Sequence, residues 1–233
     1  MVAGSAYGSY RYGIGCGWLV RKSKEQKKIM KTKKTKSKAG SIFIVTGIAL
    51  ILAALALVVF NRWDDWNAGK IASETLKPLQ QQISTSVGGG TASPSEMPMT
   101  EVNGRSYIGI VSIPTLGLTL PVQNEWNYPN LRKAPCRYQG SVYTHSLIIA
   151  GHNYQGHFGR LNTLNVGDAV QFTDVRGNTF DYQVSSMETI DKYDVSRMKS
   201  GKWDLTLFTC TIGGKKRVTV RCTQMTTAAS AQT

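Results

Sequence analysis

Groups able to bind a metal or to take part in catalysis are scarce in this sequence, which has only four Cys, three His and 14 Asp or Glu among 233 residues. None of them has the spacing of a zinc site, and no glycine-rich loop ends in Lys-Ser or Lys-Thr as a phosphate-binding loop does. Internal repeats are absent as well. We therefore expect neither a metal nor a cofactor, so any catalysis must depend on a few side chains.

Strong charge is also missing from most of the chain, although the net charge is +14. Residues 1–40 hold eleven of the 28 Lys and Arg and one acidic residue, a net of +10 that leaves only +4 for the other 193 residues. The basicity therefore belongs to a tail. A nucleic-acid-binding surface on the folded part is disfavoured.

One long apolar run covers residues 41–60, which include no charged residue. As a helix it would span about 30 Å, the thickness of a bilayer core. Basic residues precede it, while Asp64, Asp65 and two tryptophans follow it. This pattern predicts a single-pass protein of the cell membrane, with a cytoplasmic N-terminus and an extracellular C-terminal domain. A signal peptide cleaved near Ala54-Leu55-Ala56 is the alternative, but its apolar core would be only about 7–15 residues long.

Composition divides the rest of the chain. Met30-Lys31-Thr32-Lys33-Lys34 is typical of the start of a membrane-anchored protein, and our hypothesis is that residues 1–29 precede the true start. After the anchor we expect a juxtamembrane helix or stalk over 61–86, in which Trp66, Ile71, Leu76, Leu79 and Ile83 are loosely spaced. A linker rich in Gly, Ser and Pro over 87–101, a folded domain over 102–226 and a polar tail over 227–233 complete the expected organisation.

Short β-type runs separated by turn residues fill the folded domain, with no long helical pattern. This predicts an all-β barrel or sandwich, with short helices at 161–164 and 195–198. The seven expected strands are Tyr107–Ile113, Leu118–Val122, Leu147–Ala150, Ala169–Phe172, Thr179–Thr189, Leu205–Thr209 and Val218–Thr223.

The last two runs flank a Gly-Gly pair, which is typical of a two-residue hairpin turn. If Gly213 and Gly214 are its central residues, Cys210 lies opposite Arg217, on the same face and with Cβ atoms about 5 Å apart. A guanidinium beside a thiol favours the nucleophilic thiolate and can donate to an oxyanion. The alternative is a cysteine that fills a core position.

A histidine completes the candidate chemistry. The apolar strand Leu147–Ala150 ends in Gly151-His152, so the imidazole is expected at a rim of the domain, where functional groups collect on a rigid scaffold. A structural histidine is the alternative reading. His145 and His157 have the context of ordinary surface residues.

Taken together, these segments resemble the sortase family. The resemblance is carried by Thr206-Leu207-Phe208-Thr209-Cys210, by Gly151-His152 nearly sixty residues earlier and by Arg217 on the return strand. Ile113-Pro114 and Leu120-Pro121-Val122 resemble the family's first strands, while Gly167-Asp168-Ala169-Val170 and the Gly177 hairpin resemble its middle. The resemblance covers residues 105–224.

The resemblance implies an eight-stranded β-barrel transpeptidase of Gram-positive cell envelopes. Such an enzyme cleaves a C-terminal sorting motif on an exported protein and joins the new carboxyl end to an amine, usually of the peptidoglycan precursor. It further implies that Cys210 is the nucleophile, His152 the acid and base, and Arg217 the group that stabilises the oxyanion or holds the substrate backbone.

Other residues are weaker candidates for substrate contacts. Thr209 precedes the nucleophile, while Tyr193, Val195 and Met198 belong to the stretch Ile190–Trp203, which corresponds to the family's specificity loop and could equally pack a small core. Arg221 lies on the same face as Arg217, but about 13 Å from the thiol at about 3.3 Å per residue.

The other cysteines are expected to have different roles. Cys222 points away from Cys210 and is expected in the core, Cys136 follows Pro135 in a loop and is expected to be partly exposed, and Cys16 lies across the membrane. A Cys136–Cys222 disulfide stays open, since exported cysteines can form such bonds.

Three alternatives to an anchoring transpeptidase remain. A catalytically silent, membrane-tethered binding domain would keep the barrel without turnover. A hydrolytic cell-wall cysteine peptidase would more often place its cysteine before its histidine. A pilin-polymerising sortase would usually carry a lid with an Asp-Pro-aromatic motif and often a second, C-terminal membrane helix, neither of which this sequence has. The sorting motif cannot be chosen from the sequence.

Overall fold

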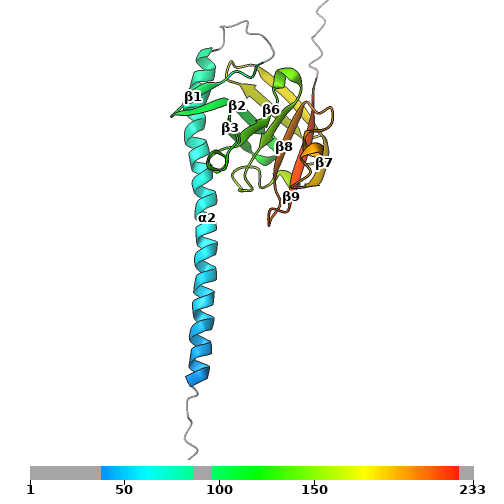
Figure 1. Cartoon of the computed structure of the whole chain (residues 1–233). Coiled ribbons are helices and arrows are strands. Elements are labelled where there is room, and N and C mark those ends of the chain that lie inside the picture. The colour runs from blue at the N-terminus through cyan, green and yellow to red at the C-terminus, as the bar shows by residue number, and fades with distance from the viewer. Residues whose placement is uncertain (1–37, 87–95, 226–233) are drawn as a thin grey trace, which may run out of the picture. The chain divides into compact units, whose positions relative to one another are not determined.

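The computed structural model describes residues 38–86 and 96–225 (Figure 1). Within these residues one long helix, α2 (Lys38–Ser86), precedes nine strands and two short helices, α3 (Tyr128–Leu131) and α4 (Val195–Lys199). The strands are β1 (Thr100–Val102), β2 (Arg105–Ile113), β3 (Leu118–Gln123), β4 (Cys136–Gln139), β5 (Leu147–Ala150), β6 (Ala169–Asp174), β7 (Thr179–Asp191), β8 (Leu205–Cys210) and β9 (Lys216–Gln224). Single 3₁₀ turns occur at Pro114–Leu116, Val142–Thr144 and Leu161–Thr163.

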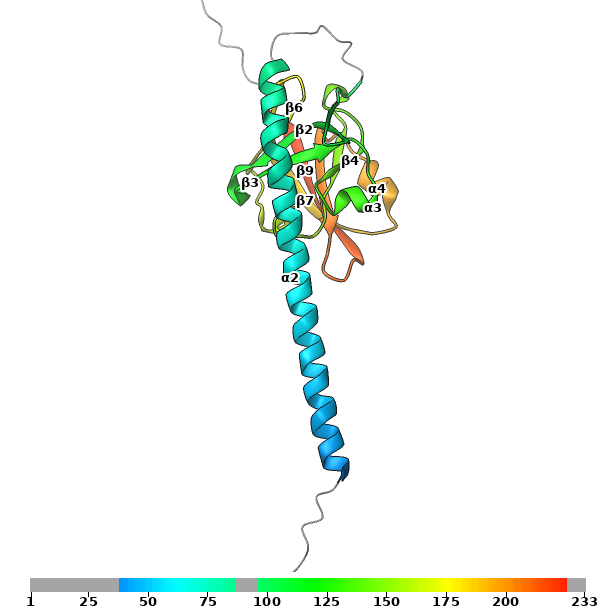
Figure 2. The ribbon, with the colours of Figure 1, turned by 90° about the vertical axis from the view of Figure 1, so that its left-hand side faces the viewer.

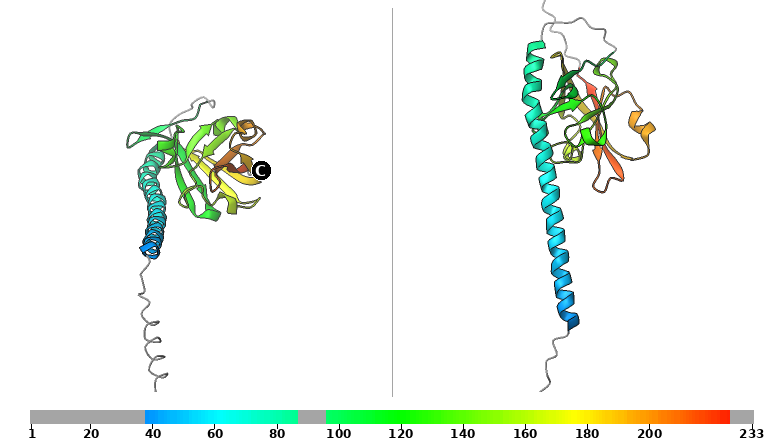
Figure 3. Two further views of the ribbon diagram at one scale, coloured as in Figure 1. Left: turned by 60° about the horizontal axis from the view of Figure 1, so that its bottom comes forward. Right: turned by 60° about the vertical axis from the view of Figure 1, so that its left-hand side comes forward.

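Eight of these strands close into a barrel. Their order is β2-β3-β4-β5-β8-β9-β7-β6, and β6 pairs again with β2, while β1 extends β2 as a hairpin outside the ring. Most neighbours are antiparallel, but β3 and β4 run parallel, as do β5 and β8. The strands curve around an enclosed interior (Figure 3). The expected all-β barrel is therefore confirmed.

All seven strands expected from the sequence are present, but β1 and β4 were not expected. β4 has only four residues and no apolar run, so no pattern distinguishes it from a loop. The expectation that Cys136 lies partly exposed in a loop was wrong. It begins β4, pairs with Ala150 and is fully buried.

The barrel has one core inside and a smaller one outside. The interior core gathers apolar side chains from nearly all strands, among them Val111, Ile149, Leu207, Val220 and Cys222. The outer core lies under α3 and α4, which occupy the same side of the barrel (Figure 2). It consists of Leu131, Cys136, Ile148, Ala150, Ile190, Met198 and Phe208. Side chains alternate between the two faces of a strand, so β5 and β8 contribute to both cores.

Chain contacts divide the protein into two units, Met1–Leu55 and Ala56–Thr233. In the first, α2 is strongly apolar and exposed, and it is the one helix of the described residues long and apolar enough to cross a membrane. The large apolar side chains from Ile42 to Leu55 are all more than half exposed, as are those from Leu57 to Phe60 at the start of the second unit. Such a continuous apolar surface is suited to lipid rather than water.

In the second unit, the last part of α2 packs on the barrel. Its buried side chains are Ala68, Ala72, Thr75, Leu79 and Ile83, which follow helical spacing along one face. Leu79 and Ile83 form a cluster with apolar residues of β1 and β2, and Ala72 joins the interior core. Of the apolar residues named for this segment, Leu79 and Ile83 are buried, whereas Trp66 is 63% exposed.

The loop after β5 is the other surface that this helix contacts. Gly69 and Gly156 come so close that a Cβ added at Gly156 would lie 3.3 Å from the Cα atom of Gly69. His157 is fully buried and faces the backbone of Ala68, and burial lowers its pKa from 6.5 to about 4. It is therefore a neutral, buried residue rather than the surface histidine expected from the sequence.

We predict that burial of His157 makes the fold acid-sensitive. Below pH 6.5 the unfolded chain takes up a proton at this residue, but the folded chain does so only near pH 4, so stability falls as the pH drops through this window. The loss is about 2 kcal/mol at pH 5. Thermal unfolding at pH 7.5 and pH 5 measures it.

In His157→Phe the difference between the two pH values should shrink. The matched control is His145→Asn, because His145 lies on the surface at a positive φ of 50° that asparagine tolerates. It should retain the acid-induced loss. An unchanged pH dependence in His157→Phe would contradict the prediction.

Candidate active site

Strand β8 delivers Cys210 to the edge of the barrel. The first five residues of the strand are buried, and only Cys210, at its end, is partly exposed. Within the described residues, Cys136 and Cys222 are buried free thiols in different cores, and burial raises the pKa of each to about 12. The disulfide left open by the sequence is therefore not formed. Among the three cysteines that the structure describes, Cys210 is the one that is partly exposed.

The register of the last hairpin is the predicted one. Cys210 pairs with Arg217, and Thr206 pairs with Arg221. The turn itself differs from the expectation of a two-residue connection. The Gly214 amide donates to the Thr211 carbonyl at 2.8 Å, and the Thr211 amide donates to the Lys216 carbonyl at 2.9 Å, so four residues form the loop. Two-residue and four-residue loops with the same centre give the same register.

Arg217 is half-buried opposite Cys210, but its hydrogen bonds go elsewhere. Within the described residues, Nη1 donates to the carbonyls of Gly214 at 3.0 Å and Lys216 at 3.1 Å. The guanidinium is thus bound to its own turn beside the thiol. Nε and Nη2 donate no hydrogen bond to the described residues, so these donors of the guanidinium are free to bind another acceptor.

Parallel pairing of β5 with β8 brings in His152. Ala150 pairs with Phe208, and the amide of Gly151 donates to the Phe208 carbonyl at 2.9 Å. The residues that follow Ala150 and Phe208 in their two strands therefore lie at the same edge of the barrel. Gly151 is required here because an added Cβ would lie 2.3 Å from the Phe158 ring. The backbone thus assembles the ends of three neighbouring strands that carry Cys210, Arg217 and His152.

The surroundings of His152 favour its neutral form. Burial lowers its pKa, the nearby charge of Arg132 lowers it further, and the carboxylates of Asp64 and Asp65 oppose both effects. Its ring stacks on Tyr154, with centroids 4.0 Å apart and planes 10° apart. Nδ1 is buried and has no hydrogen-bond partner within the part of the chain that the structure describes. A neutral imidazole can act as a base.

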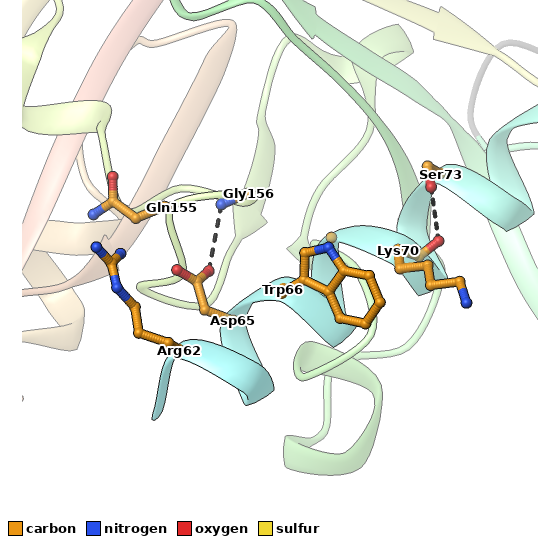
Figure 4. Close-up of a pocket in the computed structure, with 8 residues that line it drawn as sticks. Arg62, Asp65, Trp66, Lys70, Ser73, Gln155 and Gly156 are labelled. Atoms are coloured by element: carbon orange, nitrogen blue, oxygen red, sulfur yellow. Dashed lines mark hydrogen bonds between the residues drawn. The ribbon is translucent and has the colours of Figure 1, made fainter. Parts of the chain in front are cut away.

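Two cavities adjoin this loop, and both are lined by the docked part of α2. One, of about 670 Å³, is bounded by His152, by Tyr128, Arg132 and Lys133 near α3, and by Asp64 and Ala68 on α2. The other, of about 630 Å³, lies beside Gly156 (Figure 4). Arg62, Trp66 and Lys70 contribute its exposed wall, and the ammonium of Lys70 lies 5.5 Å from the Trp66 ring centroid.

The weaker substrate candidates lie in different environments. Tyr193 is 80% exposed, in the loop between β7 and β8, and Val195 is partly exposed at the start of α4. Met198 is buried in the outer core, and Thr209 is buried on the face opposite to Cys210. Tyr193 and Val195 are thus the members of this set that a peptide can reach.

Arg221 is 2% exposed and fully engaged in holding α4. It donates to Glu188 Oε1 at 3.0 Å, to Thr206 Oγ1 at 3.0 Å, and to the carbonyls of Met198 at 2.8 Å and Arg197 at 2.7 Å. Glu188 also pairs with Arg197. This network fastens the loop between β7 and β8 to the barrel.

Sequence reasoning missed Tyr154 and Asp64 as neighbours of the histidine. Tyr154 follows two residues after His152, where no periodic pattern marks it. Asp64 was read only as a charge that flanks the apolar run. Its contact with a residue ninety positions away depends on how the helix docks, for which the sequence offered no signal.

Comparison with known proteins identifies the barrel. A family model described as Sortase domain matches residues 111–225. No curated protein matches the chain. Similar solved structures include Sortase A from Corynebacterium diphtheriae (19% identity, TM-score 0.47, covering 78% of this chain and 98% of that one). Others are the Clostridium perfringens Sortase D5 transpeptidase (17%, 0.47, 67% and 97%) and sortase C1 from Streptococcus suis (21%, 0.45, 54% and 76%).

The family match runs from within β2 through the end of β9, and it includes all three strand ends described above. The solved structures belong to several sortase classes and do not select among them. Residues 111–225 form a domain of the sortase family, whose members are cysteine transpeptidases.

Proposed function

We propose that this protein is a membrane-anchored transpeptidase that cleaves a C-terminal sorting motif on exported proteins and transfers the new carboxyl end to an amine of the cell wall. The observation that carries the proposal is the placement of Cys210 at the accessible end of a buried strand. Arg217 pairs with it, and Gly151-His152 emerges from the neighbouring parallel strand. The apolar, exposed part of α2 supports a single-pass anchor, with a cytoplasmic N-terminus and the barrel outside the cell.

In the proposed reaction neutral His152 takes the proton of the Cys210 thiol, and the resulting thiolate adds to the scissile carbonyl carbon. Arg217 donates to the oxyanion that forms. The C–N bond then breaks, and protonated His152 gives its proton to the leaving amine, which leaves a thioacyl enzyme and a neutral imidazole. His152 next takes a proton from the acceptor amine as that amine attacks the thioester. The new amide forms and the Cys210 thiolate is released.

The sorting peptide is expected on the face of the barrel that carries Cys210. Phe208, two residues before the thiol on the same face of β8, is buried in the outer core, and Tyr193 and Val195 are exposed between β7 and β8. The acceptor is expected to be the amine of a peptidoglycan precursor or another cell-wall amine. Arg221, with its donors engaged, is proposed as a structural residue.

A cleavage assay tests the function directly. The full chain in detergent is incubated with a pooled pentapeptide library, with and without an added amine. We expect a defined subset of peptides to be cleaved and joined to the amine. Cleavage by water alone, with no gain from the amine, would support a peptidase, and no cleavage at all would support a silent binding domain.

The thiols should differ sharply in reactivity. Cys16 lies outside the described residues and is replaced by serine in every variant. A methanethiosulfonate reagent is then expected to label Cys210 at least tenfold faster than Cys136 or Cys222, because burial keeps the latter two protonated. Mass spectrometry of digested protein measures each site.

Cys210→Ala should form no thioacyl species with any cleaved peptide. Equal labelling of the three thiols would contradict the assignment of Cys210 as the nucleophile.

Substitution of the two arginines of β9 should have different effects, one on catalysis and the other on stability. Arg217→Lys should lower kcat/KM by about 10²- to 10³-fold, since an ammonium cannot replace a forked donor at an oxyanion, while stability changes little. Arg221→Lys should lower stability by about 3 kcal/mol, because it leaves buried partners unpaired. Peptide kinetics and thermal unfolding separate the two effects. The reverse pattern would exchange their roles.

A further inference from the structure

The His152 ring lacks the support that usually orients an acid or base. In many nucleophile–histidine pairs a third polar group holds the imidazole through a hydrogen bond. Here Nδ1 is buried and has no such partner among the described residues. The contact that does define the ring is the parallel stack on Tyr154 at 4.0 Å. Whatever fixes Tyr154 therefore also fixes His152.

Tyr154 is fixed by the docked part of α2. Its hydroxyl donates to Asp64 Oδ2 at 2.5 Å, across ninety residues of sequence. Burial, together with Asp64, raises the pKa of Tyr154 to about 12. The hydroxyl therefore stays protonated at every pH at which the enzyme could work, so the donor is always available to the carboxylate.

The helix holds the same loop at further points. Asp65 accepts from the Gly156 amide at 3.5 Å (Figure 4). Gly69 makes the close approach to Gly156, and the buried His157 lies edge-on to Tyr154 with ring centroids 5.5 Å apart. Asp65 and Gly69 lie on the part of α2 that is buried further along the helix by Leu79 and Ile83. The loop that carries His152 thus packs against α2 as well as against the barrel.

We propose that α2 is part of the active site, with Asp64 and Tyr154 as positioning residues that hold the His152 imidazole in its working orientation. This inference rests on the proposed function only for the role of His152. The helix α2 then does more than tether the barrel. Through Asp64 it holds Tyr154, and the stacking of Tyr154 on His152 sets the orientation of the imidazole.

The charges around the ring are distributed over three elements. Asp64 and Asp65 come from α2, Arg132 follows α3, and His157 and Tyr154 belong to the loop itself. The two carboxylates favour the imidazolium, whereas Arg132 and burial disfavour it. Removing a helix carboxylate should therefore shift His152 further towards its neutral form.

Nuclear magnetic resonance of the full chain in nanodiscs tests the orientation without any substrate. With histidine labelled by ¹⁵N and ¹³C, the chain has only three imidazoles to observe, and substitution of each assigns them. Tyr154→Ala should remove the ring-current shift that stacking imposes on His152, and Tyr154→Phe should retain it. Asp64→Asn should lower the pKa at which the His152 signals titrate.

Glu74→Gln is the matched control. It removes the same charge from the same helix, but Glu74 is exposed, and among residues 38–86 and 96–225 its one ion-pair partner is Lys70. The control should leave the His152 signals and their titration unchanged. Equal shifts in Asp64→Asn and Glu74→Gln, or wild-type His152 signals in Tyr154→Ala, would overturn the proposal.

Kinetics provide the second readout, with the library peptide that the wild-type chain cleaves best. Tyr154→Ala should lower kcat by about 10- to 100-fold with little change in KM, since misplacement of a catalytic group costs rate rather than binding. Tyr154→Phe should be impaired less. A chain whose wild type cleaves no peptide would refute the transpeptidase function, and the spectra would still decide whether the helix orients His152.

Discussion

The parallel pairing of β5 with β8 is the constraint on which the candidate site depends. Both strands leave the barrel core in the same direction, so the residues that follow them arrive at one edge. One strand ends in Cys210 and the other continues into Gly151-His152. An antiparallel arrangement would have sent these groups to opposite ends of the barrel. β9 then returns along β8 and adds Arg217.

Much of this arrangement could be predicted from the sequence, because it depends on patterns that short segments carry. The apolar run of β5, the alternation in β8 and β9 and the glycines between them specify strands and their register. The register prediction was right even though the turn was not, since Leu205, Leu207, Val220 and Cys222 all face the interior core and allow no slip by one residue.

What could not be predicted are contacts that small or polar residues make across long stretches of chain. β1 and β4 are too short to show alternation. The docking face of α2 begins with Ala68, Ala72 and Thr75, whose small side chains carry little hydrophobic signal but allow close approach. Arg221 looks like a surface charge until Glu188 and the carbonyls of α4 are brought around it. The direction of the Arg217 guanidinium likewise depends on turn carbonyls.

The loop between β8 and β9 has a further consequence for how this site can change. Gly213 and Gly214 lie in open space, and Ile212 is almost wholly exposed, so the loop contributes nothing to either core. The pairing of Cys210 with Arg217 is held by the strands instead. Insertions and deletions during evolution can therefore accumulate at this tip without changing which side chain faces the sulfur, but a changed length would displace the Gly214 carbonyl that holds the Arg217 guanidinium.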